Sequence, residues 1–587
     1  MDSVVNVRHC LNLSLIFCRL FCCSKPSRII VTFWEHFLRL LPRRPKPALA
    51  ALYWYLTRRR VRASNRLRAG SADLAFVYAA WIKSNEQTDD LANCCASALK
   101  HWPFKPHFSI LLHADGPFSA EQVDSSTRSI QRQIYPHWRI AGNADEPLAS
   151  RILAAEADFL VPLRVGELLS SAALFRFAEA AQANRAAAII YGDEDRLDQH
   201  DRRVQPWFKP QWNEELFLAL DYLSSAVAIE AGLAREVSAA TDPADVSELL
   251  LAATAAAQGQ IVHVPHILCN VPATRPSPEG RLEAVARHLA PVGATCSPGP
   301  FGTVKVQWPL PQNLPLVSII IPTKDKIELL RPCVRGVLER TDYPHLELLI
   351  VDNASIEART ARFLDEVAQD SRVRVLHYPE EYNFSRINNF AARQAGGAYL
   401  CLLNNDTEVI DPAWLTELMR YAVRPEIGAV GAKLLYPDGS IQHAGIVIGI
   451  GEAAGHAHRF LAAGQPGYFG VAHVPQFISA VTAACLVVEK SKFGAVGGLD
   501  ETIAVAFNDV DLCLKLQAAG WRNVYAPQAV MVHHESKSRG IDVLPASVER
   551  FRGEHQALQS RWSTKSYQDP NHHPNLDRHS ETFVIRL

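Results

Sequence analysis

The stretch LLNNDTEV (402–409) places amides and acids directly after an apolar run. Its polar residues include Asn404, Asn405, Asp406 and Glu408. A carboxylate at such a place can bind Mg²⁺ or Mn²⁺, which take one or two carboxylates together with phosphate oxygens and water. The alternative is an Asx turn at the end of a strand. The residue types by themselves leave both open.

Alternating strands and helices around this stretch predict an α/β fold with a mostly parallel sheet. Strands are predicted for VSIII (317–321), LELLIVDNAS (346–355), VRVLHY (373–378) and AYLCLLNND (398–406). Ligands of such sheets bind beyond the carboxyl ends of the strands. Asp352 and Asp406 both stand at such ends, so we expect them to face the ligand.

A shorter copy of the same pattern precedes it. The matching segments are FSILL (108–112) with VSIII (317–321), DFLVPL (158–163) with AYLCLL (398–403), and Tyr-Pro-His at 135–137 with 343–345. In the first copy 24 residues separate Tyr135 from Phe159, whereas 56 separate Tyr343 from Tyr399 in the second. We infer that the first copy lacks about one helix–strand unit.

Seven segments, in order, resemble family 2 glycosyltransferases, most closely the bacterial branch that builds O-antigen and other cell-surface polysaccharides. They are VSIIIPTKDK, LLIVDNAS, LLNNDTEV, GAKLLYPDGSIQHAG, GGLDE, FNDVDLCLKL and HHESKSRG, between about 317 and 540. The resemblance implies a GT-A nucleotide-sugar-binding fold in two tandem copies, the first degenerate. It also implies an inverting transfer of a hexose or deoxyhexose from a nucleotide-diphosphate sugar to a glycan or lipid-linked glycan, with Mn²⁺ or Mg²⁺ as cofactor.

The resemblance also assigns roles to single residues. Asp406 matches the last acid of the family's D-x-D motif and is expected to bind the metal, and His534 is expected to close on the metal or the diphosphate. Asn404 replaces the first acid of that motif. The nucleotide-sugar site is expected to comprise Pro322, Thr323, Asp325, Asp352, Asn353, Asn404 and Asn405. For Asp325 the alternative is a plain helix N-cap.

The acceptor hydroxyl of such a transfer needs a general base. FNDVDLCLKL (507–516) puts two acids at the start of an amphipathic helix. The resemblance makes Asp509 the base, with Asp511 in support, and a carboxylate in a closed, partly apolar pocket can take the proton. The alternative is a pair of acids that a helix N-terminus favours.

The first copy lacks most of these groups. RVG (164–166) stands opposite NND (404–406), and DVS (245–247) stands opposite DVD (509–511). The acidic run DED (193–195) remains, and we expect it in a solvated loop. Arginine, valine and glycine offer a cation no side-chain oxygen. We therefore expect this copy to pack against the second or to hold the acceptor rather than to transfer sugar.

Composition shifts divide the chain into five parts. They are a basic amphipathic segment (1–70), the degenerate copy (71–270), a Pro-rich linker (271–315), the catalytic domain (316–545) and a C-terminal extension (546–587). Between residues 25 and 68 there are twelve Lys and Arg and one acid. This is typical of a segment that lies on an anionic membrane surface, and a solvated basic arm is the open alternative.

The overall composition narrows the function classes. The 587 residues are 48% hydrophobic and 21% charged, with a formal net charge of -1, which is typical of a multidomain globular protein and gives no reason to expect nucleic acid. We find no apolar stretch of about 20 residues that could span a bilayer, no C-x-x-C pair for a zinc or thioredoxin-like site, and no G-x-G-x-x-G of a Rossmann dehydrogenase. We expect a cytoplasmic protein, free or peripheral on the inner membrane face. The alternative to an enzyme is a non-catalytic sugar- or nucleotide-binding scaffold.

Overall fold

A computed structural model describes most of the chain. It covers 37–38, 40–42, 44–56, 67, 70, 75–86, 88–114, 116–142, 146–272, 280–534 and 545–586. The chain forms two compact units, one of Met1–Asn85 with Asn575–Leu587 and the other of Glu86–Pro574. Both copies of the repeat lie in the second unit. Most of the basic segment 1–70 lies outside the described residues, and of it only 37–38, 40–42, 44–56, 67 and 70 are described.

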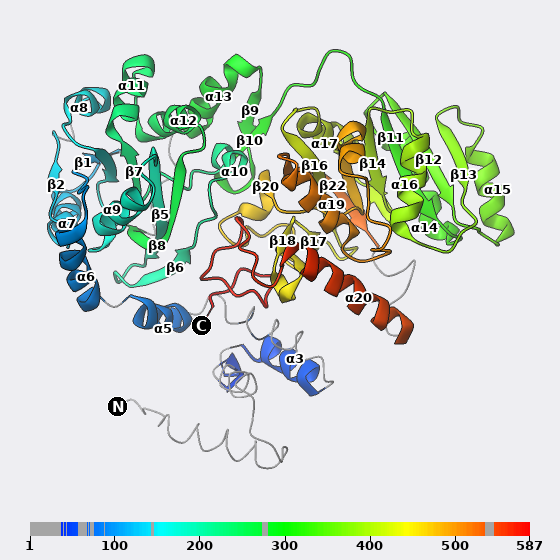
Figure 1. The fold of residues 1–587 in the computed structure, drawn as a ribbon, viewed down its shortest axis with the longest axis horizontal. Coiled ribbons are helices and arrows are strands. Elements are labelled where there is room, and N and C mark those ends of the chain that lie inside the picture. Colours follow the sequence, from blue (N-terminus) through cyan, green and yellow to red (C-terminus); the bar gives the residue numbers. More distant parts are fainter. Residues whose placement is uncertain are drawn as a thin grey trace, which may run out of the picture. The chain divides into compact units, whose positions relative to one another are not determined.

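The second copy is built on a ten-stranded sheet (Figure 1). Its strands are β11 (Val317–Thr323), β12 (Leu346–Asp352), β13 (Val373–His377), β14 (Tyr399–Leu403), β15 (Thr407–Val409), β16 (Ile427–Leu435), β17 (Ile441–His443), β20 (Gln476–Ile478), β21 (Cys485–Glu489) and β22 (Arg522–His533). The order is β13-β12-β11-β14-β21-β16-β22-β15, with β17 beside β16 and β20 beside β22. The four predicted strands are the parallel part, β13 to β14. The sheet as a whole is mixed, because β21 runs antiparallel to both of its neighbours.

Helices cover this sheet on both faces because its central strands are apolar on both sides. Ile319 and Ile321 belong to one buried cluster and Ile320, between them, to another. A near-continuous apolar strand is typical of a sheet buried on both faces. The helices are α14 (Ile327–Arg340), α15 (Ala358–Val367), α16 (Phe384–Gln394), α17 (Trp414–Ala422), α18 (Lys490–Ala495) and α19 (Asn508–Ala518), and β18 (Ile446–Ile448) pairs with β19 (Ala454–His456) apart from the sheet. This is the α/β architecture that the alternating strands and helices predicted.

The first copy repeats this plan with eight strands instead of ten. Its strands are β1 (Phe108–His113), β2 (Trp138–Ile140), β3 (Phe159–Arg164), β4 (Leu168–Leu169), β5 (Ile189–Leu197), β6 (Arg203–Trp207), β7 (Val227–Glu230) and β8 (Ile261–Pro272). The order β2-β1-β3-β7-β5-β8-β4 matches that of the second sheet from β12 to β15, so β13 has no counterpart among the described residues. The shared Tyr-Pro-His tripeptides act alike: Tyr135 donates to the Pro106 carbonyl at 2.9 Å and Tyr343 to the Pro315 carbonyl at 2.7 Å.

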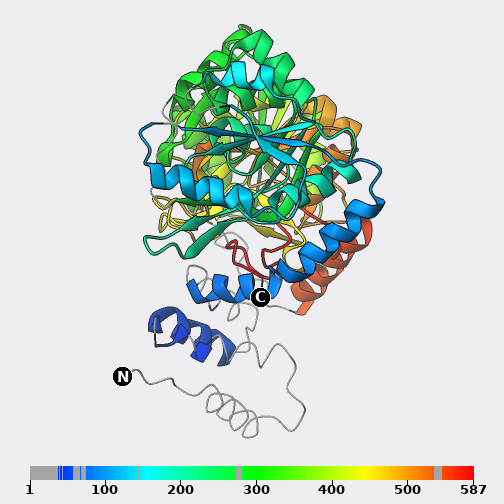
Figure 2. The same ribbon diagram turned by 90° about the vertical axis from the view of Figure 1, so that its left-hand side faces the viewer.

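Helices surround the first sheet as well, and Figure 2, which faces this domain, shows its strands crossing between them. They are α6 (Thr88–His101), α7 (Ala120–Gln131), α8 (Leu148–Ala154), α9 (Ala173–Ala183), α10 (Glu214–Ala219), α11 (Ala231–Thr241) and α12 (Val246–Ala256).

The segment predicted as a linker is largely folded. Residues 273–279 lie outside the description, but α13 (Arg281–Leu289) and the hairpin of β9 (Thr295–Pro298) and β10 (Val304–Gln307) follow them. Val285, Leu289 and Val304 are buried in the core of the first domain. The prolines and glycines that indicated a linker therefore lie at the ends of short elements, whose apolar residues join that core.

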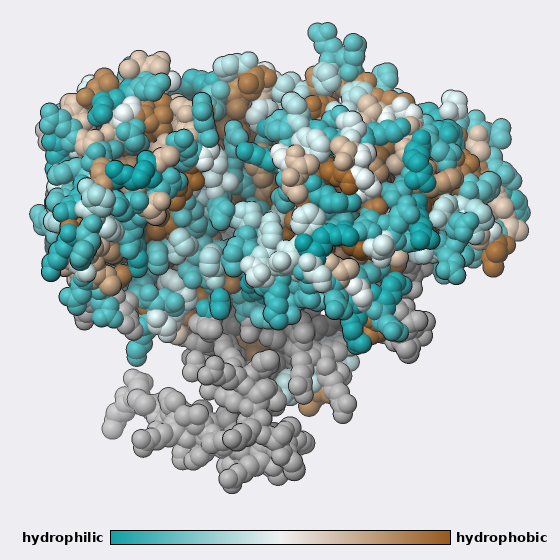
Figure 3. Space-filling view, in the orientation of Figure 1, coloured by the Kyte–Doolittle hydropathy of each residue, from teal (hydrophilic) through white to brown (hydrophobic). Residues whose placement is uncertain are grey.

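The C-terminal extension is also folded. Helix α20 (Pro545–Trp562) and the segment up to Pro574 belong to the unit that holds both copies. In the other unit the described helices include α3 (Pro45–Leu56) and α5 (Ala75–Asn85). No helix within the described residues is both long and apolar enough to cross a membrane. On the face shown in Figure 3, hydrophobic residues of the described part are scattered among hydrophilic ones.

Candidate active site

The polar group at the end of β14 is built around Asp406 and His533. Asp406 is buried, with 3% of its surface exposed, and His533 is the last residue of β22, which pairs with β15. The Nε2 atom of His533 lies 3.1 Å from Asp406 Oδ1 and 3.2 Å from Asn404 Nδ2. Its Nδ1 atom lies 2.7 Å from Gln442 Oε1. Three segments of the second domain thus converge on one imidazole.

The hydrogen bonds of His533 constrain where its protons lie. Gln442 Oε1 can only accept, so Nδ1 carries a proton that it donates to Gln442. The Nε2 atom, 3.1 Å from Asp406 Oδ1, donates to that carboxylate when it carries a proton as well. When it carries none, its lone pair and the carboxylate oxygen can bind the same cation. The pair is therefore chemically suited to a divalent metal, and Gln442 would orient the histidine as outer hydrogen bonds do in metal sites.

His534, the histidine predicted to close on the metal, lies elsewhere. Its Nε2 atom is 3.3 Å from Glu408 Oε2, and its backbone N–H donates to the Asp406 carbonyl at 2.9 Å. Successive side chains of a strand point to opposite faces, so one residue decides which histidine meets Asp406. The structure puts His533 there.

The loops after β11 and β12 are tied together by Asp325. Its Oδ1 atom accepts from the backbone N–H groups of Ile356 and Glu357 at 3.0 and 2.9 Å, and its own N–H donates to Ser355 Oγ at 2.8 Å. Asp325 therefore does not cap the helix that follows it, since α14 has no side-chain cap. It holds the start of the next helix, α15, instead. The N–H of Ser355 in turn donates to Asp352 Oδ1 at 3.0 Å.

Four other predicted binding residues lie at the strand ends. Asn353 donates from Nδ2 to the carbonyls of Tyr378 and Glu380 at 3.0 and 2.7 Å. Asn405 donates from Nδ2 to Thr323 Oγ1 at 3.0 Å. The buried residue Pro322 precedes Thr323 in β11. These residues lie at the carboxyl edge of the parallel strands, and nucleotide binding by them stays a prediction.

Asp509 stands at the start of α19 and is held by backbone groups. Its Oδ2 atom accepts from the N–H of Ala483 at 3.0 Å, and its Oδ1 atom from that of Val510 at 2.9 Å. Burial raises the pKa of this carboxyl, although these hydrogen bonds act in the opposite direction. The next residue, Ala484, accepts from the N–H of Asn404 at 3.1 Å. Asp509 and Asn404 are thus anchored to two consecutive residues just before β21.

Asp511 is enclosed by the C-terminal helix. It is fully buried, and its Oδ1 atom accepts from Arg561 Nη1 at 2.7 Å and Trp562 Nε1 at 2.9 Å, both from the end of α20. Lys515 Nζ lies 3.4 Å from Oδ2. Its contacts make Asp511 a support for α19 rather than a group aimed at a ligand.

Two residues that support the site were not predicted from the sequence. Glu554 of α20 accepts from the backbone N–H groups of Val505 and Ala506 at 2.9 and 3.0 Å, close before Asp509. Gln442 lies in GAKLLYPDGSIQHAG, a segment that marked the resemblance but had no chemical role assigned. No local sequence pattern indicated the role of Glu554, because its hydrogen-bond partners lie about fifty residues away in the chain.

Among the residues that the structure describes at the matching edge of the first copy, after β3, there is no such carboxylate–histidine pair. Arg164 Nη1 lies 3.8 Å from Glu167 Oε1, and that carboxylate also accepts from Ser225 Oγ at 2.9 Å. Asp245 caps α12, accepting from the Glu248 N–H at 2.9 Å. The run 193–195, expected in a solvated loop, is instead a buried part of β5. The expectation failed because Lys209 and Arg203 pair with Glu194 and Asp195. Two histidines from distant segments meet Asp193.

Comparisons with known proteins show which family and which proteins this chain is similar to. Residues 318–455 match the family model "Glycosyl transferase family 2". The uncharacterized protein y4gI of Sinorhizobium fredii is 39% identical over 79% of this chain and 52% of its own length. The O-antigen biosynthesis protein RfbC of Myxococcus xanthus is 36% identical over 67% of this chain and 32% of its own. The chain thus spans about half of the one relative and a third of the other.

A solved structure was also matched, a mannosyltransferase of Pyrobaculum calidifontis in complex with GDP-Man and Mn²⁺. It is 18% identical, covers 46% of this chain and 70% of its own, and has a TM-score of 0.33. A likeness this low carries no argument about the present site.

Proposed function

Because this chain contains a glycosyltransferase domain of family 2, we propose that its second domain transfers a sugar from a nucleotide-diphosphate sugar to a hydroxyl of a glycan or lipid-linked glycan. The observation that carries the proposal is the convergence of Asp406 and His533 at the carboxyl edge of the sheet, where α/β folds bind their ligands. The similarity to an O-antigen biosynthesis protein supports a role in making cell-surface polysaccharide.

We propose that Asp406 and His533 hold Mn²⁺ or Mg²⁺, with Gln442 orienting the imidazole. When bound, the cation supplies positive charge that stabilises the diphosphate leaving group. Asn404, whose Nδ2 atom lies 3.2 Å from His533 Nε2, is close enough to that position to contact a donor phosphate. Asp352 and Asp325, in the two loops at the same edge, are proposed to face the nucleotide.

The proposed transfer is a single displacement. The acceptor hydroxyl oxygen forms a bond to the anomeric carbon of the donor, while the bond from that carbon to the diphosphate oxygen breaks. Asp509 takes the hydroxyl proton, and the bonding electrons leave with the nucleoside diphosphate. Attack opposite the leaving group inverts the anomeric centre. The raised pKa of Asp509 makes it a stronger base than an exposed aspartate.

Thermal-shift measurements with UDP-, GDP- and dTDP-sugars, each with and without Mn²⁺, would test the proposal. A ligand that binds only the folded state raises the unfolding temperature, so we expect one nucleotide series to stabilise the protein, and more strongly with metal. Release of free sugar from that donor, or transfer to an acceptor, identifies an enzyme. Binding without any turnover under all metal conditions would favour the non-catalytic scaffold.

The cytoplasmic location and the contact of the basic segment 1–70 with the inner membrane face stay predictions. Fractionation of cells that express the full chain, at low and at high salt, would test them. Release from membranes by salt is expected of a basic segment on an anionic surface, since screening weakens that attraction.

A further inference from the structure

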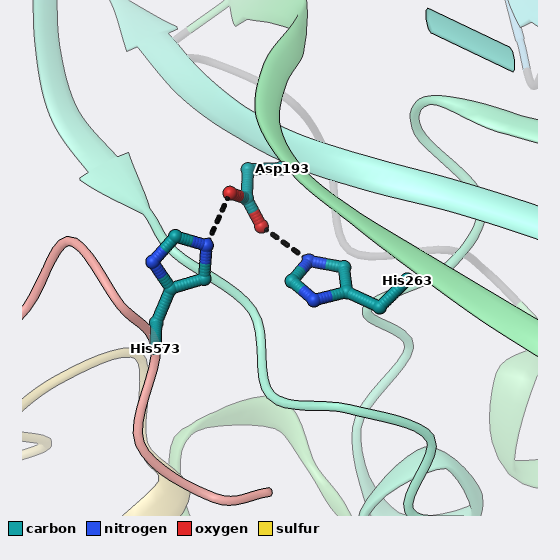
Figure 4. Close-up of side chains that lie close together, drawn as sticks. All are labelled: Asp193, His263 and His573. Carbon is teal, nitrogen blue, oxygen red and sulfur yellow. Dashed lines mark hydrogen bonds and ion pairs between the residues drawn. The ribbon is translucent and has the colours of Figure 1, made fainter. Parts of the chain in front are cut away.

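A second group of potential metal ligands lies in the first domain, away from the proposed transfer site. Asp193 of β5, His263 of β8 and His573 of the C-terminal segment point toward one another (Figure 4). His263 Nε2 lies 2.8 Å from Asp193 Oδ1, and His573 Nε2 lies 2.8 Å from Asp193 Oδ2. The side chains are 0%, 7% and 0% exposed for Asp193, His263 and His573. They come from three segments, one of which is more than 300 residues from the others.

Asp193 differs from the two acids that follow it in the kind of side chain that neutralises its charge. Its neighbour Glu194 lies 3.0 Å from Lys209 Nζ and 3.2 Å from Arg196 Nη2, and Asp195 pairs with Arg203 at 2.5 Å. Within the described part of the chain, Asp193 has no Lys or Arg side chain as a partner, only the two imidazoles and a backbone N–H. A fully buried carboxylate needs positive charge nearby.

The shell around the group is apolar and well packed. The ring of His263 stacks on Tyr191 at 4.9 Å between centroids, and that of His573 stacks on Phe208 at 5.0 Å. The backbone N–H of Lys209 donates to Asp193 Oδ1 at 2.9 Å and fixes the carboxylate. The aromatic rings hold both imidazoles against the carboxylate.

We propose that Asp193, His263 and His573 bind one divalent transition-metal ion of the zinc class. Two imidazoles and a carboxylate are ligands that zinc takes in proteins, at about 2.0 to 2.2 Å. The three ligand atoms lie within 4.8 Å of one another, so shifts of about 1 Å would bring all three to such an ion. The ion would add positive charge directly beside the buried Asp193 carboxylate. This site is independent of the proposed transfer.

The role of such an ion would be to fix the C-terminal segment to the first domain. The C-terminal segment also contacts the first domain through two hydrogen bonds. The Pro570 carbonyl accepts from the N–H of Gln211 at 2.9 Å, and Asn571 Oδ1 accepts from Asn213 Nδ2 at 3.1 Å. Asp569 Oδ2 accepts from the N–H of Ile448, in the second domain, at 2.6 Å. An ion on His573 would lock a segment that contacts both copies of the repeat.

Metal analysis of the full chain tests this site. The protein is purified without chelator, incubated with Zn²⁺, desalted, and its metal content is measured by mass spectrometry. We expect about one zinc per chain, and nearly none in the His263→Gln and His573→Gln variants. His572→Gln is the matched control, because His572 is also buried and lies next to His573 outside the cluster. Asp406→Ala should also keep the zinc, which separates this site from the proposed Mn²⁺ site.

Two results would overturn the proposal. One is a wild-type chain that holds no more zinc than the His263→Gln/His573→Gln double variant, in which case the cluster is only a hydrogen-bonded His–Asp–His group. The other is zinc that His573→Gln retains in full. Because a substitution can also unfold the chain for other reasons, wild-type protein treated with chelator is compared with untreated protein by limited proteolysis. Faster cleavage within 563–587 after chelation is expected, and equal cleavage contradicts the fastening role.

Discussion

At the scale of single residues, Asp406 is the group on which metal-dependent transfer should depend. Asp406→Ala removes a carboxylate at the sheet edge rather than an apolar core contact, so the fold should persist while transfer falls to background. Activity measured across a Mn²⁺ titration, with circular dichroism as the check on folding, tests this. Wild-type turnover in the variant at any Mn²⁺ concentration would refute the assignment. Gln442→Glu is a useful companion, because a carboxylate can still accept the His533 proton and should preserve metal binding.

Asp509 should govern the chemical step and its pH dependence. Asp509→Asn nearly preserves shape but cannot take a proton, so kcat should fall by roughly 10² to 10⁴ while donor affinity stays. Asp509 must be ionised to act, and burial raises its pKa. The acid limb of the kcat profile in the wild type should therefore lie above the pKa of about 4 of an exposed aspartate. Calorimetry that shows a collapse of donor affinity in the variant would make Asp509 a binding residue instead.

At the scale of elements, helix α20 should hold the start of α19 in place. Arg561 and Glu554 contact Asp511 and the backbone before Asp509, so Arg561→Gln and Glu554→Gln should let the general base shift. We expect kcat to drop roughly ten- to a hundredfold with little change in donor KM, because misplacement of a catalytic group by about 1 Å is costly.

The exposed residues Arg552 and Glu549 of the same helix offer matched controls. Arg552→Gln and Glu549→Gln should leave kcat unchanged. An equal loss of kcat in the controls would show that α20 acts through stability alone. If the acid limb of the kcat pH profile does not move in Arg561→Gln, that result would argue against an effect on Asp509.

At the scale of the whole molecule, we predict that the first copy transfers no sugar. The edge that would hold the metal has Arg164 paired with Glu167, and valine and glycine follow. Arg164→Gln should keep turnover within about twofold, whereas Asp406→Ala should abolish every linkage formed. Product analysis with the natural acceptor decides this, and a second linkage that survives Asp406→Ala would show that the first copy is an enzyme.

The two copies should also unfold together because charged and aromatic contacts join them. Glu215 of the first copy is buried and pairs with Arg424 of the second, which also lies 3.9 Å over the ring of Trp308. Arg424→Met leaves the carboxylate without its partner and should cost about 3–5 kcal/mol of the free energy of unfolding. Glu215→Gln added to Arg424→Met should recover most of that loss in urea titrations.

The free energy of unfolding of the Arg424→Met variant should depend on pH through the carboxyl group of Glu215. Burial raises the pKa of its carboxyl even beside Arg424, so loss of the guanidinium should raise it further. The folded variant then binds a proton that the unfolded chain releases, and its stability falls as pH rises through that window. Urea midpoints should therefore differ less between Arg424→Met and wild type at pH 5 than at pH 8. A difference that grows toward low pH would contradict this account.

Local spacing in the sequence was enough to identify the repeat, the parallel strands of the second copy and the strand end that carries Asp406. The runs 317–321 and 346–352 are strands because β-branched and apolar residues suit a sheet buried on both faces. The missing unit of the first copy was also visible, since it is a difference in length between matching segments. The roles predicted for nucleotide binding rest on resemblance and await the experiments above.

Only the tertiary structure decided which side chains meet. His533 rather than His534 faces Asp406, because strand register selects one face and a shift of one residue reverses it. Asp325 holds the start of α15 rather than its own helix, Asp511 is enclosed by α20, and the acids 193–195 are buried beside His573. Each of these contacts joins residues about 30 to 380 positions apart. Periodicity along the chain reports which residues are buried together with their near neighbours, but such distant contacts arise only when the sheets close and the C-terminal segment packs onto them.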